Sequence, residues 1–205
     1  IYKYIISNTN DVQGTDTNGL KSFLQQGADV GNMSSINDDG DSMVLWQWVA
    51  GGTSTPSVNT DAGFSIAKYT GNGSAGNTVT HSLTVDPEFI CVKKLAAGDD
   101  STSRHWAVYH VSQGNTKYAL LSDSNAFATS SGYWNNVTPG TSTFTVGTDD
   151  SVNGNNAPYV AYCWAGVEGY SKFGSWTGNG STDGPYIHCG FKPEFVIHKR
   201  SAGNI

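Results

Sequence analysis

The sequence contains the pentapeptide TGNGS twice, at residues 70–74 and 177–181. Each copy follows a Gly-aromatic-Ser triplet, at residues 63–65 and 169–171. Each copy also precedes a Pro-Glu-Phe triplet, which begins at Pro87 in the first case and at Pro193 in the second. Because three motifs recur in the same order, the sequence predicts a structural unit that is repeated along the chain.

A second pair of segments matches without a gap. Residues 36–48 (INDDGDSMVLWQW) match residues 152–164 (VNGNNAPYVAYCW) at an offset of 116 positions (159 against 43), whereas Pro-Glu-Phe recurs after 106 (193 against 87). Extra residues in the linker 51–60 account for the difference, and YIIS at 4–7 is weakly similar to YALLS at 118–122. The prediction is a chain that is a fragment of a longer protein. It would hold the C-terminal part of a first repeat with its linker (1–62), a complete second repeat (63–168) and the N-terminal part of a third (169–205).

Composition favours β-structure. Charged residues make up 14% of the chain and aromatic residues 12%, with 25 glycines, which is typical neither of disorder nor of helices. Short alternating runs between Gly, Asn, Ser and Thr turns predict an all-β fold of tandem β-sandwich modules, jelly-roll or lectin-like in type. An internal repeat of about 106–116 residues has the size of one such domain. One short helix is predicted around residues 18–26.

Alternation within the predicted strands indicates which side chains form the core. Residues 43–48 and 159–164 place a bulky aromatic stripe on equivalent faces, so Trp46, Trp48, Tyr162 and Trp164 are predicted to be mostly buried. Val44 and Val160 would share this face. Further strands are predicted at residues 78–85, 89–92, 106–110, 117–121 and 195–197.

The repeated TGNGS sequence has two interpretations. Residues 71–76 match the G-x-G-x-x-G spacing of a dinucleotide-binding loop. That mechanism needs a helix directly after the glycines, because the phosphate binds the free N–H groups of the helix. Residues 78–85 alternate like a strand instead. Since Asn-Gly tolerates positive φ angles, the favoured interpretation is a hairpin turn.

Charge and cysteine content exclude several function classes. The net charge is −6 with no basic stripe, so nucleic acid is not an expected partner. The pairs 93–94 and 199–200 are predicted to be solvated. No apolar run is long enough for membrane insertion. Cys91, Cys163 and Cys189 form no CxxC motif, which predicts free thiols that behave as small buried apolar groups.

No catalytic set recurs in both copies. His81 and His188 occupy equivalent positions, but no serine or cysteine accompanies them in both places, so they are predicted to hydrogen-bond backbone. The chain is therefore expected to have no enzymatic activity and no cofactor. Asp38, Asp39 and Asp41 are candidate calcium ligands. Their counterparts at 154–157 contain no carboxylate, so a metal site would not be a property of the repeated unit.

Several longer motifs carry a family resemblance. They comprise Gly-(Phe/Tyr)-Ser with TGNG, Pro-Glu-Phe with its basic pair, WAVYH at 106–110, FTVG at 144–147, and the run 159–174. Together they resemble an uncharacterised tandem β-domain of structural and tail-associated, fibre-like proteins of marine tailed bacteriophages. The resemblance covers residues 63–205, and residues 1–62 keep mainly the 43–48 strand. That family has no established catalytic residues to transfer.

The resemblance implies a non-catalytic structural or appendage protein on the virion surface, as a decoration, fibre or tail-associated protein. Its expected partners are other virion proteins or copies of itself in a homo-oligomer, with host-surface glycans as further candidates for attachment. The alternative is a carbohydrate-binding module of a bacterial surface adhesin or of a glycan-active enzyme, in which exposed aromatic rings stack on sugars. The candidate ligand-binding residues are Trp176, Tyr69 in the equivalent place, and Trp134 in the polar loop 130–138.

Overall fold

Strand β13 (Pro158–Trp164) is the centre of the main sheet. The computed structural model describes residues 3–4, 14–15, 18–43, 47–48, 55–96 and 105–203. β13 pairs antiparallel with β6 (Phe64–Thr70) along one side and with β8 (Phe89–Lys94) along the other. The sheet has seven strands in the order β11-β10-β9-β8-β13-β6-β5. Its remaining strands are β5 (Ser57–Asn59), β9 (Trp106–His110), β10 (Lys117–Leu120) and β11 (Ala128–Thr129).

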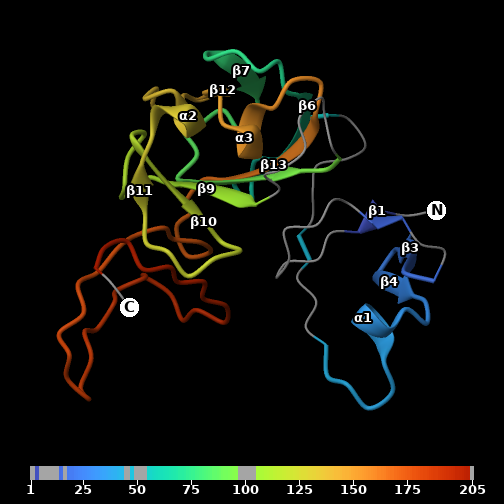
Figure 1. The fold of residues 1–205 in the computed structure, drawn as a ribbon. Helices are drawn as coiled ribbons and strands as arrows, with labels where there is room; N and C mark the ends of the chain where they lie inside the picture. Colours follow the sequence, from blue (N-terminus) through green and yellow to red (C-terminus); the bar gives the residue numbers. More distant parts are fainter. Residues whose placement is uncertain are drawn as a thin grey trace.

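A smaller layer covers one face of this sheet (Figure 1). It consists of the antiparallel pair β7 (Asn77–Thr80) and β12 (Thr143–Val146), with the short helices α2 (Ser131–Trp134) and α3 (Asp150–Asn153). The main core lies between the two layers. Its largest fully buried apolar side chains are Trp134, Tyr159, Phe144, Leu83 and Ile90. The predicted all-β sandwich fold is confirmed.

The two faces of β13 are covered unequally. Tyr159, Ala161 and Cys163 point into the main core and are fully buried. Tyr162 and Trp164 lie on the opposite face and are only partly buried. The prediction that Tyr162 and Trp164 are mostly buried is confirmed, but the fully buried side chains lie on the other face, because alternation separates the two faces without telling which one the second layer covers. Trp48 is 42% exposed, and Trp46 lies outside the described residues.

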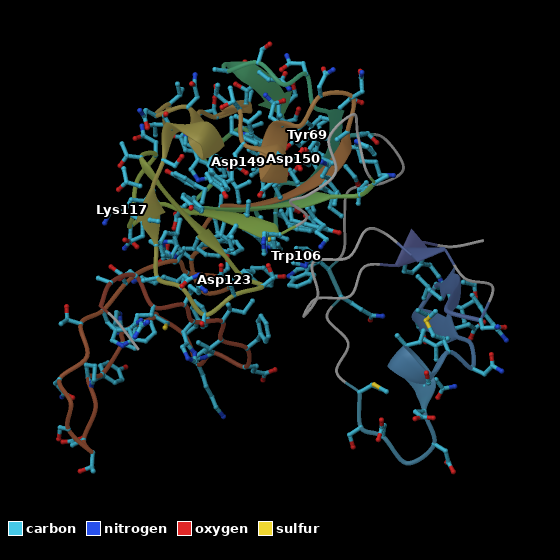
Figure 2. All side chains as sticks on the ribbon, in the orientation of Figure 1. Tyr69, Trp106, Lys117, Asp123, Asp149 and Asp150 are labelled. Atoms are coloured by element: carbon cyan, nitrogen blue, oxygen red, sulfur yellow. The ribbon has the colours of Figure 1, made fainter. Side chains whose placement is uncertain are left out.

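Two adjacent lysines on β8 are buried inside the domain. Lys93 and Lys94 are both 0% exposed, so the prediction that this pair is solvated is wrong. β8 is an inner strand, and successive side chains point to opposite faces of it. The Lys94 ammonium pairs with the Asp150 carboxylate of α3 at 2.5 Å, and the Lys93 ammonium lies 5.3 Å from the centre of the Trp106 ring. Figure 2 labels the two partners, Asp150 and Trp106. Each charge is thus paired with an electron-rich partner on its own side of the sheet.

The first TGNGS copy forms a corner between layers. β6 belongs to the seven-stranded sheet, whereas β7 pairs with β12, so the predicted hairpin turn is wrong. The loop passes close to α3, and a Cβ atom on Gly71 would lie 2.2 Å from the Gly154 oxygen. Gly73 has φ of +67°, a conformation that favours glycine. The glycines are therefore required by packing and backbone geometry.

The N-terminal part of the chain forms short hairpins. They are built from β1 (Lys3–Tyr4), β2 (Gly14–Thr15), β3 (Leu20–Leu24) and β4 (Gly27–Val30), followed by α1 (Ser34–Asn37). The helix predicted at residues 18–26 is wrong, because residues 20–24 form β3, which pairs with β4. The window is too short for a 3.6-residue period to be told apart from alternation.

The same local geometry occurs in residues 3–37 and in residues 117–153. The β1–β2 pair has the register Lys3↔Thr15 and the β10–β11 pair has Lys117↔Thr129, a shift of 114 positions (117 against 3) at both ends. The Asn37 amide donates to the Gly31 oxygen at 2.7 Å, just as the Asn153 amide donates to the Gly147 oxygen at 2.6 Å, 116 positions later (153 against 37). β4 and α1 are displaced from β12 and α3 by the same 116 positions.

Residues 169–203 do not follow the path of residues 63–94. The earlier segment contains β6, β7 and β8, whereas the later one has only an isolated bridge at Ser171 among its described residues. The later segment therefore lacks the strands β6, β7 and β8 of the earlier one, although the sequence motifs of the two segments match. β6 and β8 do not pair with each other, and each forms its ladder with β13. Residues 169–203 contain no sequence like that of β13.

The unequal faces of the sheet predict unequal costs of truncation. We expect Trp134→Ala to lower the free energy of unfolding by about 3–5 kcal/mol, because the indole is fully enclosed in the main core. Trp164→Ala should cost less, about 1–2 kcal/mol, because its ring is partly exposed. Urea unfolding of both variants against the parent chain measures the difference, and equal costs would contradict this assignment of the core.

Candidate functional site

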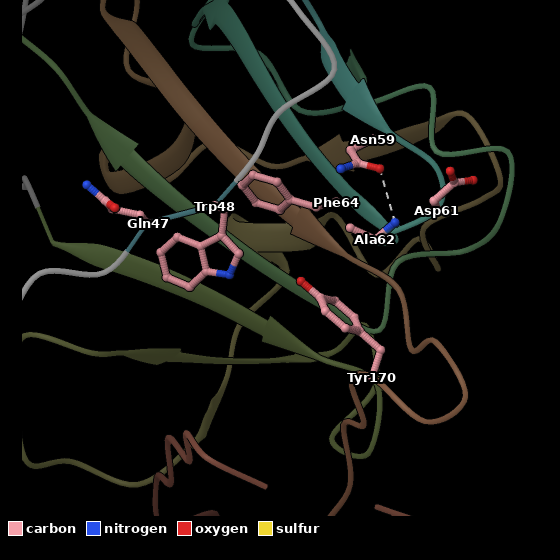
Figure 3. A pocket seen from close by; sticks show the side chains of 7 residues that line it. All are labelled: Gln47, Trp48, Asn59, Asp61, Ala62, Phe64 and Tyr170. Carbon is pink, nitrogen blue, oxygen red and sulfur yellow. Dashed lines mark hydrogen bonds between the residues drawn. The ribbon is translucent and has the colours of Figure 1, made fainter. Parts of the chain in front are cut away.

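An open pocket lies where residues 47–48 meet the start of β6. Its volume is about 500 Å³, and Figure 3 shows the side chains around it. The lining residues are Gln47, Trp48, Asn59, Asp61, Ala62, Phe64 and Tyr170. They come from three stretches of chain that lie before, within and after the main sheet.

Aromatic rings form the floor and the walls of the pocket. The register of β13 on β6 places Trp164 beside Phe64, with ring centroids 5.0 Å apart. Trp48 packs edge-on against Trp164 at 5.5 Å and lies 6.0 Å from Phe64. In Figure 3 the Tyr170 hydroxyl points toward the Trp48 indole. Trp48 and Tyr170 are 42% and 59% exposed, so both present aromatic surface to solvent.

Polar groups stand beside these rings. The Asn59 side-chain oxygen accepts from the Ala62 N–H at 3.1 Å, which fixes the β5–β6 connection (Figure 3). Asp61 and Gln47 are exposed at the rim. Aromatic surface with a few polar groups at its edge is the general composition of small-molecule sites. The arrangement suits a neutral, polyhydroxylated ligand, whose apolar C–H face would cover a ring and whose hydroxyls would meet the carboxylate and amides.

The structure separates the three predicted ligand-binding residues. Trp134 is 0% exposed in the main core, so it has no face to offer a sugar and the prediction for it is wrong. Tyr69 is partly buried, its ring stacks on Tyr159 at 5.0 Å, and its hydroxyl donates to the Val152 oxygen at 2.6 Å. Burial and, secondarily, the neighbouring Tyr159 raise the pKa of Tyr69 well above 10. Tyr69 is therefore a structural residue, and Trp176 alone of the three is strongly exposed.

Trp176 lies outside the pocket lining, so the structure does not bring the predicted residues together. Sequence reasoning missed Trp48 and Tyr170 as ligand-facing residues. The gapless match of residues 36–48 and 152–164 places Trp48 at the position of Trp164, and the Gly-aromatic-Ser triplets place Tyr170 at that of Phe64. Trp48 was thus predicted to be core, although it lies with Tyr170 at the wall of an open pocket.

The aspartates proposed as calcium ligands lie in an exposed loop after α1. Asp38, Asp39 and Asp41 are all exposed, and the Asp41 N–H donates to the Asp38 backbone oxygen at 3.3 Å. In the part of the chain that the structure describes, no group of three or more His, Cys, Asp or Glu side chains is arranged to hold a metal ion.

A second hollow, of about 390 Å³, lies beside the chain segment that follows β13. Its titratable residues are Glu88, Glu168, Lys172, His188 and Cys189. The Cys189 thiol donates to the Ile187 backbone oxygen at 3.6 Å. Cys91 and Cys163 are buried free thiols, as predicted, and burial raises the pKa of Cys91 to about 12. The two core thiols are thus held in the neutral form, which is the unreactive one.

The sequence of the chain matches that of a protein family. A family model described as "Domain of unknown function (DUF7483)" matches residues 1–204. The chain belongs to this family. No curated protein and no solved structure is significantly similar to it. Since the family description states no activity, functional inference for this member rests on its own residues.

His81 is a buried polar residue at the position that corresponds to His188 in the sequence. It is fully buried, and its Nδ1 accepts from the Leu83 N–H at 3.1 Å. The proton therefore sits on Nε2, which lies 2.9 Å from the Gly140 oxygen and donates to it. The prediction of a histidine that hydrogen-bonds backbone is confirmed for His81. Desolvation lowers its pKa, and the bond to Gly140 opposes that shift in part.

Asn153 holds the glycine-rich loop, a role that sequence reasoning missed. Its side-chain oxygen accepts from the Asn72 N–H at 3.0 Å and from the Asn77 amide at 2.9 Å. Its amide nitrogen donates to the Ser74 oxygen at 2.8 Å and to the Gly147 oxygen at 2.6 Å. The loop that resembles a phosphate-binding motif is thus filled by one buried side chain of α3.

No helix of the described residues is long and apolar enough to cross a bilayer.

The neutral state of His81 predicts acid sensitivity. Its pKa in the folded protein lies below the value of about 6.5 in the unfolded chain, so its contribution is complete above pH ~6.5. Below that pH the unfolded chain binds a proton that the folded protein does not, and stability falls until the folded pKa is passed. Desolvation shifts the pKa of His110 in the same direction.

We therefore expect the free energy of unfolding to decrease as the pH falls below about 6.5, by up to ~1.4 kcal/mol per pH unit for each such histidine. His81→Asn keeps an acceptor for the Leu83 N–H and should make this dependence shallower. Urea unfolding over a series of pH values measures the slope, and His198→Asn, at an exposed histidine, controls for the substitution. An unchanged slope in His81→Asn would contradict the assignment.

Proposed function

We propose that the chain is a non-catalytic structural module of an appendage on a tailed-phage particle, in a decoration, fibre or tail-associated protein. The observation that carries the proposal is the recurrence of the same hydrogen-bonded geometry in residues 3–37 and 117–153. Serial copies of one β-unit supply reach, and weak contacts by each copy add up through avidity. The family resemblance of residues 63–205 supports the same role. The partners would be other virion proteins and further copies of the chain.

The use of the buried polar side chains supports a structural role. His81 bonds two backbone groups, Asn153 binds the corner loop, and Lys94 pairs with Asp150. The Lys94–Asp150 pair joins the two layers of the sandwich, whereas the bonds of His81 and Asn153 fix the loops of the smaller layer and the corner between the layers. None of the three lines either of the two pockets described above.

A direct test follows from the proposed location. An antibody raised against the 205 residues should label particles of the phage that carries the gene, and the chain should be found by mass spectrometry in purified particles. The isolated chain should cleave no glycosidic, ester or peptide bond in a substrate panel. Cleaving activity that disappears in His188→Asn or His81→Asn, with the fold intact, would overturn the non-catalytic assignment.

The aromatic pocket favours a second candidate function, recognition of a glycan on the host surface. Trp48 and Tyr170 offer exposed rings beside Asp61, and the pocket is open to solvent. This function extends the appendage role, because an exposed appendage is the part of a particle that meets the host. It also fits the alternative of a carbohydrate-binding module in an adhesin or in a glycan-active enzyme.

If the pocket binds glycans, Trp48→Ala and Tyr170→Ala should each weaken binding about tenfold or more, since aromatic anchors dominate binding energy. A glycan array with the full chain identifies the ligand, and titration calorimetry with that glycan measures the loss. Tyr186→Ala, at an aromatic residue that is 89% exposed and outside the pocket, is the matched control. Loss of binding in the control but not in the pocket variants would place the site elsewhere.

A further inference from the structure

We propose that the aromatic pocket accepts neutral and amino sugars but rejects acidic ones, and that Asp61 is the residue that determines this selectivity. The inference deepens glycan recognition, the second candidate function, and it rests on that function. It names the charge class of the ligand. Sugars that carry a carboxylate or a sulfate where they meet the pocket would be excluded.

Asp61 is the single charged residue in the stretches of chain that build the pocket. All lining residues except Tyr170 come from residues 42–67, and Asp61 alone is charged in that range. Tyr170 stands between the uncharged Gly169 and Ser171. The lining residues that the structure describes include no lysine, arginine or histidine. A ligand in the pocket therefore meets one negative charge from the lining and no positive one.

The cations that lie next in the sequence do not line the pocket. Lys68 follows Phe64 by four positions on β6 (68 against 64), which is about 13 Å along a strand. Lys172, two positions after Tyr170, lines the second hollow instead. An acidic group beside Asp61 would therefore find no cation in the pocket lining to balance it. A charge that must give up water without such a partner weakens binding.

The carboxylate stands on a turn whose backbone is fixed. The Gly63 N–H donates to the Thr60 oxygen at 3.1 Å, and the Gly63 oxygen accepts from the Ala165 N–H at 2.8 Å. Gly63 has φ of +59°, and a Cβ atom on it would lie 2.6 Å from the Ala165 oxygen. The turn that carries Asp61 is thus held against the end of β13. The charge stays at the rim, because the turn has no freedom to move away from an approaching anion.

The aromatic surface of the pocket acts in the same direction as the carboxylate. The faces of aromatic rings are the negative part of the ring quadrupole, so they attract cations and C–H groups and repel anions. Trp48 and Tyr170 expose such surface. The contacts of Trp48 with Trp164 at 5.5 Å and with Phe64 at 6.0 Å hold its ring in place. Rings and carboxylate together favour a ligand without negative charge.

Hydrogen bonding adds to the effect of charge. A carboxylate only accepts hydrogen bonds, and a sugar hydroxyl or ammonium group donates to it. A carboxylate or sulfate on the ligand has no hydrogen to donate, so it loses this bond and is repelled as well. Two like charges about 5 Å apart repel by an amount equivalent to about fourfold in affinity in water and to about 300-fold at an intermediate dielectric constant. Because the pocket is open, we expect a selectivity of about tenfold.

Matched glycans test the selectivity. The probes are neutral oligosaccharides on a glycan array and the same oligosaccharides after oxidation of their primary hydroxyls to carboxylates. The 205-residue chain should bind the neutral forms about tenfold more tightly. Asp61→Asn keeps the shape of the side chain and a carbonyl acceptor, so it should still bind the neutral forms. Its preference for them should fall below about threefold, because the repelling charge is gone.

A control variant separates the local charge from the net charge of the chain. Asp86→Asn also removes one negative charge, at an exposed position outside the pocket, and should keep the full preference. The preference of the parent chain should also shrink in ~1 M salt, where charges are screened beyond about 3 Å.

The outcomes distinguish the selectivity from glycan recognition itself. If both forms bind the parent chain equally and Trp48→Ala abolishes binding of both, the selectivity is overturned and glycan recognition stands. An equal loss of preference in Asp86→Asn and Asp61→Asn would overturn the role of Asp61. If no oligosaccharide of either form binds, glycan recognition by the pocket is wrong and the selectivity falls with it.

Discussion

The pairing of β13 with both β6 and β8 is the constraint on which the rest of the fold depends. β6 lies nearly a hundred positions before β13 in the sequence, and β8 comes between them, yet neither forms a ladder with the other. The middle of the sheet is therefore filled by its last strand. Long-range pairing of this kind requires a long loop to close, and the entropy of loop closure is lost before the stabilising contacts form. Residues 169–203 contain no sequence like that of β13, and no strand is present among their described residues.

The sequence allowed the all-β class and the main strands to be predicted, because alternation is a local property. Strands at 89–92, 106–110 and 117–121 were expected, and β8, β9 and β10 occupy those positions. What could not be predicted depends on how strands are arranged in space. The corner at residues 71–76 has the composition of a hairpin turn, and only the topology shows that β6 and β7 belong to different layers. Two adjacent lysines at the end of a strand, such as Lys93 and Lys94, are typical of a solvated strand end. Only the packing on both faces of β8 shows that they are buried.

The candidate site was harder to predict than the fold for a related reason. Trp134 was expected to be exposed because its loop is polar in sequence, yet it is enclosed beneath β12. Trp48 was expected to be buried because it matches Trp164, yet it lies at a junction where no second layer covers it. Trp48 and Trp164 match in sequence, but their exposure is set by what packs on them. Alternation and sequence matches do not reveal which aromatic residues are left uncovered, so the pocket that Trp48 lines could not be predicted.

A chain with uncovered strand-like segments must either pair them or keep them from pairing, because exposed apolar edges promote aggregation. Residues 177–188 contain one proline, three glycines and one charged residue, Asp183, which is little protection for a segment that exposes Tyr186 and Ile187. The loop at residues 177–181 keeps the turn geometry of the first TGNGS copy, although a Cβ atom on Gly178 would have no atom within 4 Å. A partner built like β12 and α3 would satisfy both the backbone of this segment and its apolar side chains. Within the sandwich, β12 and α3 cover the side chains of the matching segment β7, so cover of this kind keeps the same sequence pattern from exposing apolar surface.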